Sequence, residues 1–529
     1  MASAASRRSV LGRSVLGWSV LGWAALVGIV AAACTLAAAE LTSVLISPQA
    51  SPVFAVGRWI IDLAPAGAKE FAIAVFGAAD KAVLLIALAL LVTIVAALTG
   101  VLEWLARGWG IVVLVAVSTI AVLAVTTRAH ADGFSAVPTV LGMLLGALVL
   151  YRGIRRLRAW RDASERGTAS APPVARRSFL RLLLLSGAAA VVIGVGARVA
   201  NAGAVAVTAL RERIRLPRPA TAAAAVPAAA TLTVPGLSTF VTDSVDFYRI
   251  DTALQIPTVD PDQWSLTIDG MVQETVSVSF AELLRLPLTE RLITLSCVSN
   301  EVGGDLIGNA RWLGYPIRSL LERAKPKPGA DMVLSHSADG WTAGTPLEVL
   351  QDRNRSAILA VGMNGEPLPF AHGFPVRMVV PGLYGYVSAT KWVVRLELTS
   401  FAKQSAYWTT QGWAPRGPVK TESRIDTPRE GQRLDVGRVA IAGVAWAPHT
   451  GIRSVEVQVD AGAWQPARLA EPVSADTWRQ WMLPWEATRG RHTLSVRATD
   501  LSGYTQTARE ASPVPDGATG WHRVQVNVG

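Results

Sequence analysis

The residue best suited to chemistry is Cys297, in the stretch Leu295-Ser-Cys-Val-Ser-Asn-Glu-Val-Gly-Gly304. The only other cysteine, Cys34, lies in an apolar N-terminal run, so Cys297 has no disulfide partner in the polar part of the chain. An apolar run before the thiol and Ser, Asn and Gly after it predict a strand that opens into a loop. A thiolate there would be a good ligand for a soft or redox-active metal. Taken alone, a cysteine in a protein of this size is more often an inert buried residue.

A second group of candidates lies downstream, in a stretch rich in Gly and Pro that runs from Met363 to Trp392. This stretch carries His372, Arg377 and Lys391 among residues that shape turns. Cationic donors and free backbone amides beside small residues are typical of a site for phosphate or another anion. Each residue alone could instead be structural, since a histidine in a turn or an arginine on a strand often only bonds its neighbours.

Composition divides the chain into two parts. With 529 residues it is too long for one core, and 51% of its residues are hydrophobic. Residues 1–220 carry 22 Lys and Arg but only 9 Asp and Glu, whereas the remainder carries 28 and 30. The excess positive charge therefore belongs to the apolar part, where it indicates orientation in a membrane. Nucleic-acid binding is excluded by the lack of a net basic charge on the polar part.

Residues 1–204 are predicted to form a transmembrane region, because a bilayer is crossed by roughly 20 apolar residues. Residues 40–80 are mixed and predict a loop with a surface-lying segment. Arg107 and the arginines from Arg152 to Arg181 would lie on the cytoplasmic side. The remaining chain would then lie outside the cytoplasmic membrane of a multi-pass protein. The five expected spans are roughly 15–39, 82–102, 109–126, 136–151 and 180–200.

The last of these spans follows Arg176-Arg-Ser-Phe-Leu-Arg181, which resembles a twin-arginine export signal. The alternative is that the arginines are only the positive flank of one more helix. A twin-arginine signal would export the following domain already folded, as expected of a protein that acquires a complex cofactor in the cytoplasm.

Three further regions are expected after the spans. Residues 205–239 are rich in Ala and Pro and predict a tether. Residues 240–421 mix short helices and strands without regular crossovers, which favours an α+β domain. Residues 422–529 alternate polar and apolar residues at the spacing of an immunoglobulin-like β-sandwich without a disulfide. The strands and helices expected from 240 onward are 264–270, 280–285, 292–297, 317–324, 332–337, 357–361, 376–380, 392–398, 439–446, 454–460, 478–483, 492–498 and 522–528.

Taken together, these motifs resemble the sulfite oxidase family of molybdopterin enzymes, in its bacterial membrane-tethered form. The resemblance covers roughly residues 243–529 and is carried by segments in the family's order and spacing. These segments are Thr294-Leu-Ser-Cys297 with Ser299-Asn300, Ala310-Arg-Trp312, Met363-Asn-Gly-Glu-Pro-Leu-Pro369, His372-Gly-Phe-Pro-Val-Arg377, Val380-Pro-Gly382 and Lys391-Trp392. The C-terminal sandwich would then resemble the family's dimerisation domain, which implies a possible homodimer.

The resemblance implies a molybdenum cofactor, with molybdenum held by a pterin dithiolene and by the thiolate of Cys297. Arg249, in Phe247-Tyr-Arg-Ile-Asp251, matches the arginine that lines the family's anion pocket and is expected to act in catalysis with Cys297. Cofactor-binding residues implied by the motifs are Cys297, Ser299, Asn300, Arg311, His372, Arg377, Ser388 and Lys391.

Two departures bear on the substrate. The family carries a tyrosine two residues before the Met-Asn pair, where this chain has Val361. After the cysteine it continues Ala-Gly-Asn-Arg-Arg, where this chain has Val298-Ser-Asn-Glu301-Val. Sulfoxide reduction, or oxidation of another small substrate, therefore fits as well as sulfite oxidation. We expect two-electron oxygen-atom transfer on a small sulfur- or nitrogen-oxo substrate, and the alternative is a non-enzymatic extracellular binding module.

Electrons would have to be exchanged with a separate partner, such as a quinone or a cytochrome. The sequence has no Cys-x-x-Cys-His haem attachment site and no cytochrome b5-like segment. His130 is the only histidine before residue 240, so paired histidine ligands for haem are missing from the predicted spans. The spans are therefore predicted to serve as an anchor or as a docking surface.

The twin-arginine hypothesis can be tested by Arg176→Lys combined with Arg177→Lys, which keeps both positive charges. Because the export signal requires the arginine pair, the double variant is expected to leave the domain in the cytoplasm. Protease accessibility of the domain in spheroplasts measures this, and unchanged accessibility would show that the arginines only flank a helix.

Overall fold

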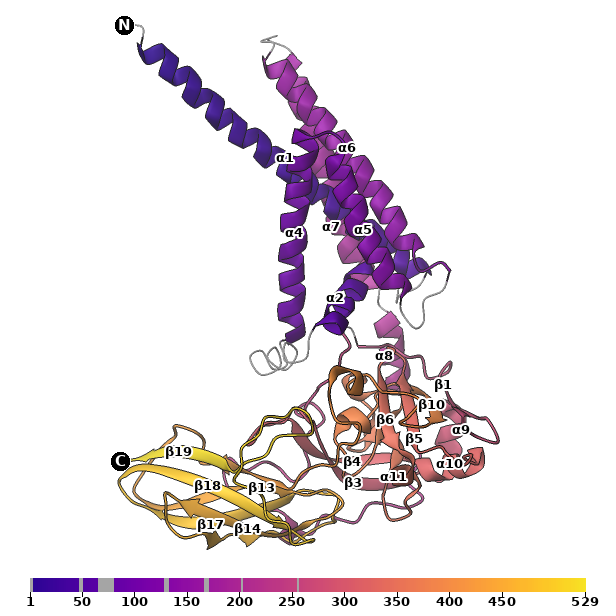
Figure 1. Cartoon of the computed structure of the whole chain (residues 1–529), viewed down its shortest axis with the longest axis vertical. Coiled ribbons are helices and arrows are strands. Elements are labelled where there is room, and N and C mark those ends of the chain that lie inside the picture. The colour runs from indigo at the N-terminus through magenta and orange to yellow at the C-terminus, as the bar shows by residue number, and fades with distance from the viewer. Residues whose placement is uncertain are drawn as a thin grey trace. The chain divides into compact units, whose positions relative to one another are not determined.

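The computed structural model describes residues 3–46, 51–64, 80–127, 133–165, 171–200, 203–254 and 256–529. The chain forms two compact units (Figure 1). The first is Met1–Ala206 with Thr252–Gln255, and the second is Val207–Asp251 with Ile256–Gly529. Expected features at 65–79, and His130, fall outside the described residues.

The first unit is built from helices that pack around α1. Its helices are α1 (Ser3–Ile46), α2 (Pro52–Leu63), α4 (Asp80–Leu105), α5 (Trp109–Thr126), α6 (Val137–Glu165) and α7 (Ala171–Ala200), and α8 (Gly203–Arg213) begins in this unit. Helix α1 packs against α4, α6 and α7. A Cβ atom on Gly28 would collide with the carbonyl of Ala96, and one on Gly100 with that of Ala24. The backbones of α1 and α4 are therefore in direct contact, as is common between helices in membranes.

Four of the described helices are long and apolar enough to cross a membrane, namely Val20–Ser43, Ala82–Leu105, Trp109–Thr126 and Val137–Ala163. Large apolar side chains point outward from α4, where Leu90, Ile94 and Leu98 are each more than half exposed. These four helices cover four of the five expected spans. The fifth lies within α7, and its side chains at 193–200 are outside the described part of the chain.

Two sheets form the α+β part of the second unit. One has the order β2-β1-β10-β5-β6, and the other has the order β3-β4-β7-β8 with β9 on β7. Short helices begin where the sequence supplies caps. Helix α9, for example, is held by a capping box between Ser279 and Glu282. The elements are β1 (Ser265–Gly270), β2 (Val276–Ser279), α9 (Phe280–Arg285), β3 (Thr289–Ser296), β4 (Ile307–Pro316), α10 (Ile317–Ala324), β5 (Met332–Ser337), β6 (Thr342–Pro346), α11 (Leu347–Gln351), β7 (Ile358–Met363), β8 (Glu366–Pro367), η4 (Phe370–His372), β9 (Arg377–Val379), η5 (Gly385–Val387) and β10 (Val393–Thr399).

The β3-β4-β7 sheet is buried on both faces. On one face Leu313 and Leu359 join a core shared with the other sheet, and on the opposite face Ile293 and Trp312 join a core that includes Phe247. Strands buried on both faces have apolar residues in succession instead of in alternation. This explains the apolar run that the sequence shows just before Cys297.

The C-terminal part consists of two further sheets, with orders β11-β13-β17-β16 and β12-β19-β18-β14-β15. Ile441 and Trp481 from one sheet and Val457 and Val496 from the other share one core. The predicted strands in this region are confirmed; β14 and β19 alternate buried apolar residues with more exposed polar ones, whereas the second half of β13 is buried throughout. The strands are β11 (Glu422–Thr427), β12 (Arg433–Leu434), β13 (Gly437–Trp446), β14 (Ile452–Val459), β15 (Gln465–Pro466), β16 (Arg468–Leu469), β17 (Arg479–Ala487), β18 (Gly490–Asp500) and β19 (His522–Val528).

The segment 205–239 differs from the expected free tether. It begins as the end of α8 and continues as extended chain that bonds to the strands beside it. The amide of Ala220 donates to the carbonyl of Leu288, and the amide of Leu232 donates to Gln480. Ala and Pro leave the backbone extended and available, so the chain pairs with polar groups of the domain.

A buried polar network joins β3 to the C-terminal sheets. The hydroxyl of Thr294 donates to Oδ1 of Asn309 at 3.1 Å and accepts from the amide of Trp478 at 2.8 Å. The side-chain N–H groups of Asn309 and Trp478 both donate to the carbonyl of Phe240. The network therefore fixes the strand that ends at Cys297 to the C-terminal part.

Thr294→Val is isosteric but removes both of these hydrogen bonds. The amide of Trp478 and Oδ1 of Asn309 would be left buried without a partner, so the free energy of unfolding should fall by about 1–3 kcal/mol. Urea denaturation of the detergent-solubilised chain measures this. Thr289→Val on the same strand is the control, since its hydroxyl makes only a 3.5 Å contact with Gly314. Equal losses in the two variants would contradict the prediction.

Candidate functional site

Cys297 is the first residue after β3, in the turn between β3 and β4. Its amide donates to the carbonyl of Leu306, and its carbonyl accepts from the amide of Asn300. Oδ1 of Asn300 accepts from the amide of Leu306 at 2.8 Å, while its Nδ2 is buried with no partner. The turn is thus held closed by Asn300, and Cys297 is half-buried in it.

The C-terminal sheets complete the outer wall of this turn. The guanidinium of Arg424 donates to the carbonyl of Gly304 at 2.7 Å. A Cβ atom on Gly303 would collide with the ring of His522, so only glycine fits between the turn and β19.

Two effects act in opposite directions on the thiol of Cys297. Burial raises its pKa, while hydrogen bonds from Ser299 and the positive charge of Lys391 act to lower it. Burial is the larger effect, so the free thiol is favoured until a metal or another positive charge is bound.

His372 is buried at the end of η4. Its Nε2 lies 2.9 Å from the carbonyl of Ser244 and therefore donates to it, which assigns the neutral ring an acceptor at Nδ1. Burial, together with the charges of Arg377 and Lys391, lowers the pKa of His372 to about 4. Because Nδ1 is buried without a partner, it can accept a hydrogen bond from a bound ligand.

Arg377 is 4% exposed at the start of β9. Its guanidinium donates to the carbonyl of His372 at 3.2 Å and lies 5.0 Å from the centre of the Trp312 ring. Burial lowers the pKa of Arg377 to about 10, so the group is charged at neutral pH. No carboxylate pairs with it among the described residues.

Lys391 and Arg249 share one carboxylate, that of Asp251. Both Nζ of Lys391 and Nε of Arg249 lie 2.9 Å from its Oδ2. Burial lowers the pKa of Lys391 to about 8; Asp251 opposes this shift and Arg377 adds to it. Two cationic side chains thus share one carboxylate, and the charge of Arg377 acts on Lys391 beside them. A buried surplus of positive charge is costly unless an anion binds there.

Tyr248 and Asp251 are functional candidates that the sequence analysis missed. The Tyr248 ring stacks on Phe247, and burial, with the charge of Cys297, raises the pKa of its phenol. Phe247 also contacts the rings of Trp312 and His372. Both residues could have been found from the sequence by their position beside Arg249. Asp251 in particular lies two positions beyond that arginine and is a natural partner for its charge.

Arg311 is not brought to this site. On β4 the side chain of Trp312 faces the cations, so that of Arg311 points to the opposite face, where it pairs with Glu290 at 2.9 Å. Its backbone instead holds the turn at Asn364, whose Oδ1 accepts from the amide of Arg311. The two-residue period of the strand therefore turns the Arg311 side chain away from Arg377, and its cofactor-binding role stays a prediction.

The other expected positions lie near the site in different roles. Ser299 bonds the thiol of Cys297, and Ser388 is fully buried with its hydroxyl donating to the carbonyl of Tyr384. Val298 and Val361 are buried in the core shared by the two sheets. Glu301 stands where the family pattern has an arginine. It is exposed, so this position supplies no cation to the site.

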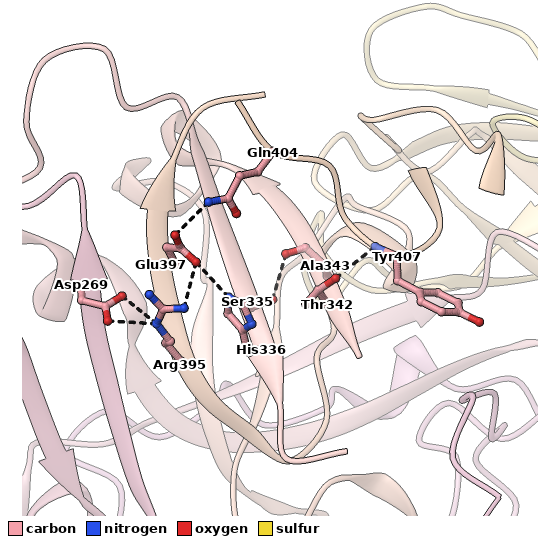
Figure 2. Close-up of polar contacts among 9 residues, drawn as sticks. All are labelled: Asp269, Ser335, His336, Thr342, Ala343, Arg395, Glu397, Gln404 and Tyr407. Atoms are coloured by element: carbon pink, nitrogen blue, oxygen red, sulfur yellow. Dashed lines mark hydrogen bonds and ion pairs between the residues drawn. The ribbon is translucent and has the colours of Figure 1, made fainter. Parts of the chain in front are cut away.

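A second charged cluster lies on β1, β5 and β10 (Figure 2). Arg395 pairs with Asp269 at 2.9 Å and with Glu397 at 3.0 Å, and Glu397 also contacts His336 at 3.2 Å. Each charge in this cluster has a partner of opposite sign. The cluster therefore needs no ligand, unlike the cations beside Cys297.

Comparison with known proteins places this arrangement in context. The family profile described as "Oxidoreductase molybdopterin binding domain" matches residues 253–408. The mitochondrial sulfite oxidase of Homo sapiens is 30% identical over 329 residues, covering 52% of this chain and 59% of the human protein. The uncharacterized oxidoreductase YuiH of Bacillus subtilis is 32% identical over 158 residues, covering 30% of this chain and 76% of that protein.

One solved structure, the sulfane dehydrogenase SoxCD from Paracoccus pantotrophus, overlaps 57% of this chain and 85% of its own, at 23% identity and a TM-score of 0.47. The chain spans about six tenths of the length of the mitochondrial relatives.

Gly373 follows His372 and lies against Arg377 and Lys391, with φ +108°. A Cβ atom there would lie 3.0 Å from Cβ of Arg377 and 3.1 Å from Cα of Lys391. Gly373→Ala is therefore expected to reduce the free energy of unfolding by about 1 kcal/mol or more beyond the strain of a positive φ. Gly365→Ala supplies the control, because Gly365 has φ +87° and open space around its Cβ position. Urea denaturation compares the two, and equal losses would refute the crowding.

Proposed function

Because the chain belongs to the sulfite oxidase family of molybdopterin-dependent oxidoreductases, we propose that it catalyses two-electron oxygen-atom transfer on a small sulfur- or nitrogen-oxo substrate. The observation that carries the proposal is the buried surplus of cations beside the half-buried Cys297. An inert core cysteine would not require such a surplus, whereas an anionic, metal-bearing cofactor does.

The residues of the site fit the molybdenum cofactor that the family implies. Its pterin carries a phosphate, and Arg377 and Lys391 supply buried positive charge for a phosphate group. Nδ1 of His372 and Nδ2 of Asn300 are buried polar atoms that a pterin can satisfy. When bound, the cofactor supplies the two-electron oxygen-atom chemistry.

Each residue has a distinct role in this proposal. Cys297 provides a thiolate ligand for molybdenum, and Ser299 orients the sulfur by hydrogen bonding. Ser388 keeps the backbone of the Lys391 loop in place through its bond to Tyr384. Arg249, about one third exposed and held by Asp251, is the cation that binds the oxo group of the substrate near the thiol.

The departures from the family pattern favour a neutral oxo substrate. A valine at position 361 removes a phenol, and the exposed Glu301 stands where the family has an arginine. With fewer donors, the site is less suited to sulfite, a dianion at high pH, than to a sulfoxide or an N-oxide, whose dipole needs one cation.

We also propose the setting of this activity. Helices α1, α4, α5 and α6 anchor the chain in the membrane, α7 is the fifth span, and the second unit lies outside the cytoplasm. Residues 240–421 form the catalytic domain, and 422–529 form an immunoglobulin-like domain that supports a homodimer. A quinone or a cytochrome exchanges electrons with the site.

Cys297→Ser in the full-length chain tests the proposal. Wild-type protein purified in detergent is expected to carry about one molybdenum per chain, and the variant should lose at least nine tenths of it, because a hydroxyl is a much poorer ligand than a thiolate. Elemental analysis by mass spectrometry measures the metal.

Cys34→Ser is the matched control, since Cys34 lies in α1 of the first unit, where its thiol donates to the carbonyl of Ser186. It should retain the metal. A folded wild-type protein without molybdenum would overturn the proposal in favour of a binding module.

A further inference from the structure

Helix α6 (Figure 1) carries a stripe of apolar side chains that ends in two arginines. The apolar members are each between 42% and 58% exposed. They recur every three or four residues and therefore share one face of the helix, on which the next positions are two exposed arginines. The members of this α6 stripe are Leu141, Leu144, Leu148, Tyr151, Arg152 and Arg155. Along one surface, the helix thus passes from apolar to cationic.

The opposite face of α6 is packed against α1, which fixes the rotation of the helix. A Cβ atom on Gly142 would collide with the carbonyl of Thr35, and one on Gly146 with the hydroxyl of the same residue. A Cβ atom on Gly153 would collide with the side chain of Val27. Because only glycine allows this close approach, the α6 stripe is held on the side of the helix that faces away from α1.

The positive charge at the end of the α6 stripe is not balanced by neighbouring acids. Among the described residues, Arg152 and Arg155 have neither an ion pair nor a hydrogen bond. Residues 152–162 contain five arginines and one acidic residue. The carboxylate of Glu103 on α4 is already used, since it accepts from the amide of Gly108 at 3.0 Å and from the next turn of the chain. The two arginines are therefore open to an external anion.

Arg158 and Trp104 indicate the depth of this end of α6 in a membrane. Nη2 of Arg158 donates to the carbonyls of Glu103 at 2.7 Å and Trp104 at 3.1 Å, and its guanidinium carbon lies 5.6 Å from the centre of the Trp104 ring. These carbonyls belong to the last turn of α4, where backbone acceptors have no partner within the helix. Tryptophan is enriched at the level of the lipid headgroups. Arg155, one turn before Arg158, is thus expected at the headgroup level.

We propose that the α6 stripe binds an anionic phospholipid of the phosphatidylglycerol class, with its acyl chains along Leu144 and Leu148 and its phosphodiester at Arg152 and Arg155. The inference rests on the proposed membrane setting and is independent of the redox chemistry. Guanidinium groups bind phosphate oxygens through paired, charge-assisted hydrogen bonds. A zwitterionic lipid is disfavoured, because its headgroup brings a positive charge to the arginines.

The other possible occupant of the α6 stripe is a second copy of the chain. Two copies inserted in the same direction would bring Arg152 and Arg155 of one against the same residues of the other. Like charges placed opposite each other are destabilising, whereas a lipid phosphate neutralises them. Charge complementarity therefore favours the lipid.

Arg152→Gln combined with Arg155→Gln tests the site, because it removes two charges that bond to nothing else in the described chain. The full-length protein in dodecyl maltoside is mixed with equal amounts of dioleoyl phosphatidylglycerol and dioleoyl phosphatidylcholine, and native mass spectrometry counts the lipids bound. The wild type should prefer phosphatidylglycerol by about tenfold, and the double glutamine variant should lose most of that preference. The double lysine variant at the same positions keeps the charges and should stay within about threefold of the wild type.

Two further variants separate the parts of the site. Leu144→Ala with Leu148→Ala leaves the charge unchanged and should weaken binding of phosphatidylglycerol several-fold, because apolar contact with the acyl chains is lost. Arg433→Gln with Arg438→Gln removes two exposed arginines of the second unit and should leave lipid binding unchanged. Excess inorganic phosphate should not displace the lipid, since it makes no contact with the apolar part of the α6 stripe.

The outcomes separate the lipid site from the proposed membrane setting. Equal binding of the two lipids by the wild type, or an unchanged preference in the double glutamine variant, overturns the lipid site. A dimer in the native spectrum that the leucine variant converts to monomer also overturns it, in favour of an interface between copies. Release of the wild type from membranes by alkaline carbonate overturns the membrane setting itself. The molybdenum content that tests the proposed activity is measured separately and is unaffected by any of these results.

Discussion

The organising constraint in this molecule is the burial of positive charge beside Cys297. Arg249 and Lys391 share the carboxylate of Asp251, Arg377 pairs with no carboxylate that the structure describes, and desolvation lowers the pKa of Arg377 and Lys391. Such a cluster opposes folding unless the surrounding structure holds it and an anion offsets it. The rest of the site follows from this: His372 is kept neutral, aromatic rings cover the guanidinium, and Gly373 lets two cationic segments approach closely.

The fold meets this constraint by joining segments that are far apart in the sequence. Cys297 lies at the end of β3, and Arg377 and Lys391 lie in the segments around β9 and η5. Arg249 and its partner Asp251 come from the chain before β1. A sheet buried on both faces provides the rigid base, since its strands are packed from two sides. By contrast, the charges on β1, β5 and β10 satisfy one another on the sheet and need no such support.

Much of this could be predicted from the sequence. Cys297, His372, Arg377 and Lys391 have distinctive types in turn-rich stretches, and most strands showed clear apolar patterns. Strand β4 was not predicted, because the polar Asn309 and Arg311 interrupt its pattern, and without the strand the outward face of Arg311 could not be known. The role of Asp251 depends on its pairing with Lys391, a residue far along the chain, which no local pattern encodes. The packed course of residues 214–239 was hidden for the same reason, since Ala and Pro specify an extended chain but not what it lies against.

The turn that bears Cys297 is closed from outside by Arg424 and by the ring of His522, which fills the space beside Gly303. His522 is synthesised more than two hundred residues after the cysteine. The contact between its ring and Gly303 can therefore form only after β19 has been made and paired. Strand β19 is therefore needed to complete the site, because without His522 the turn that bears Cys297 lacks its support beside Gly303.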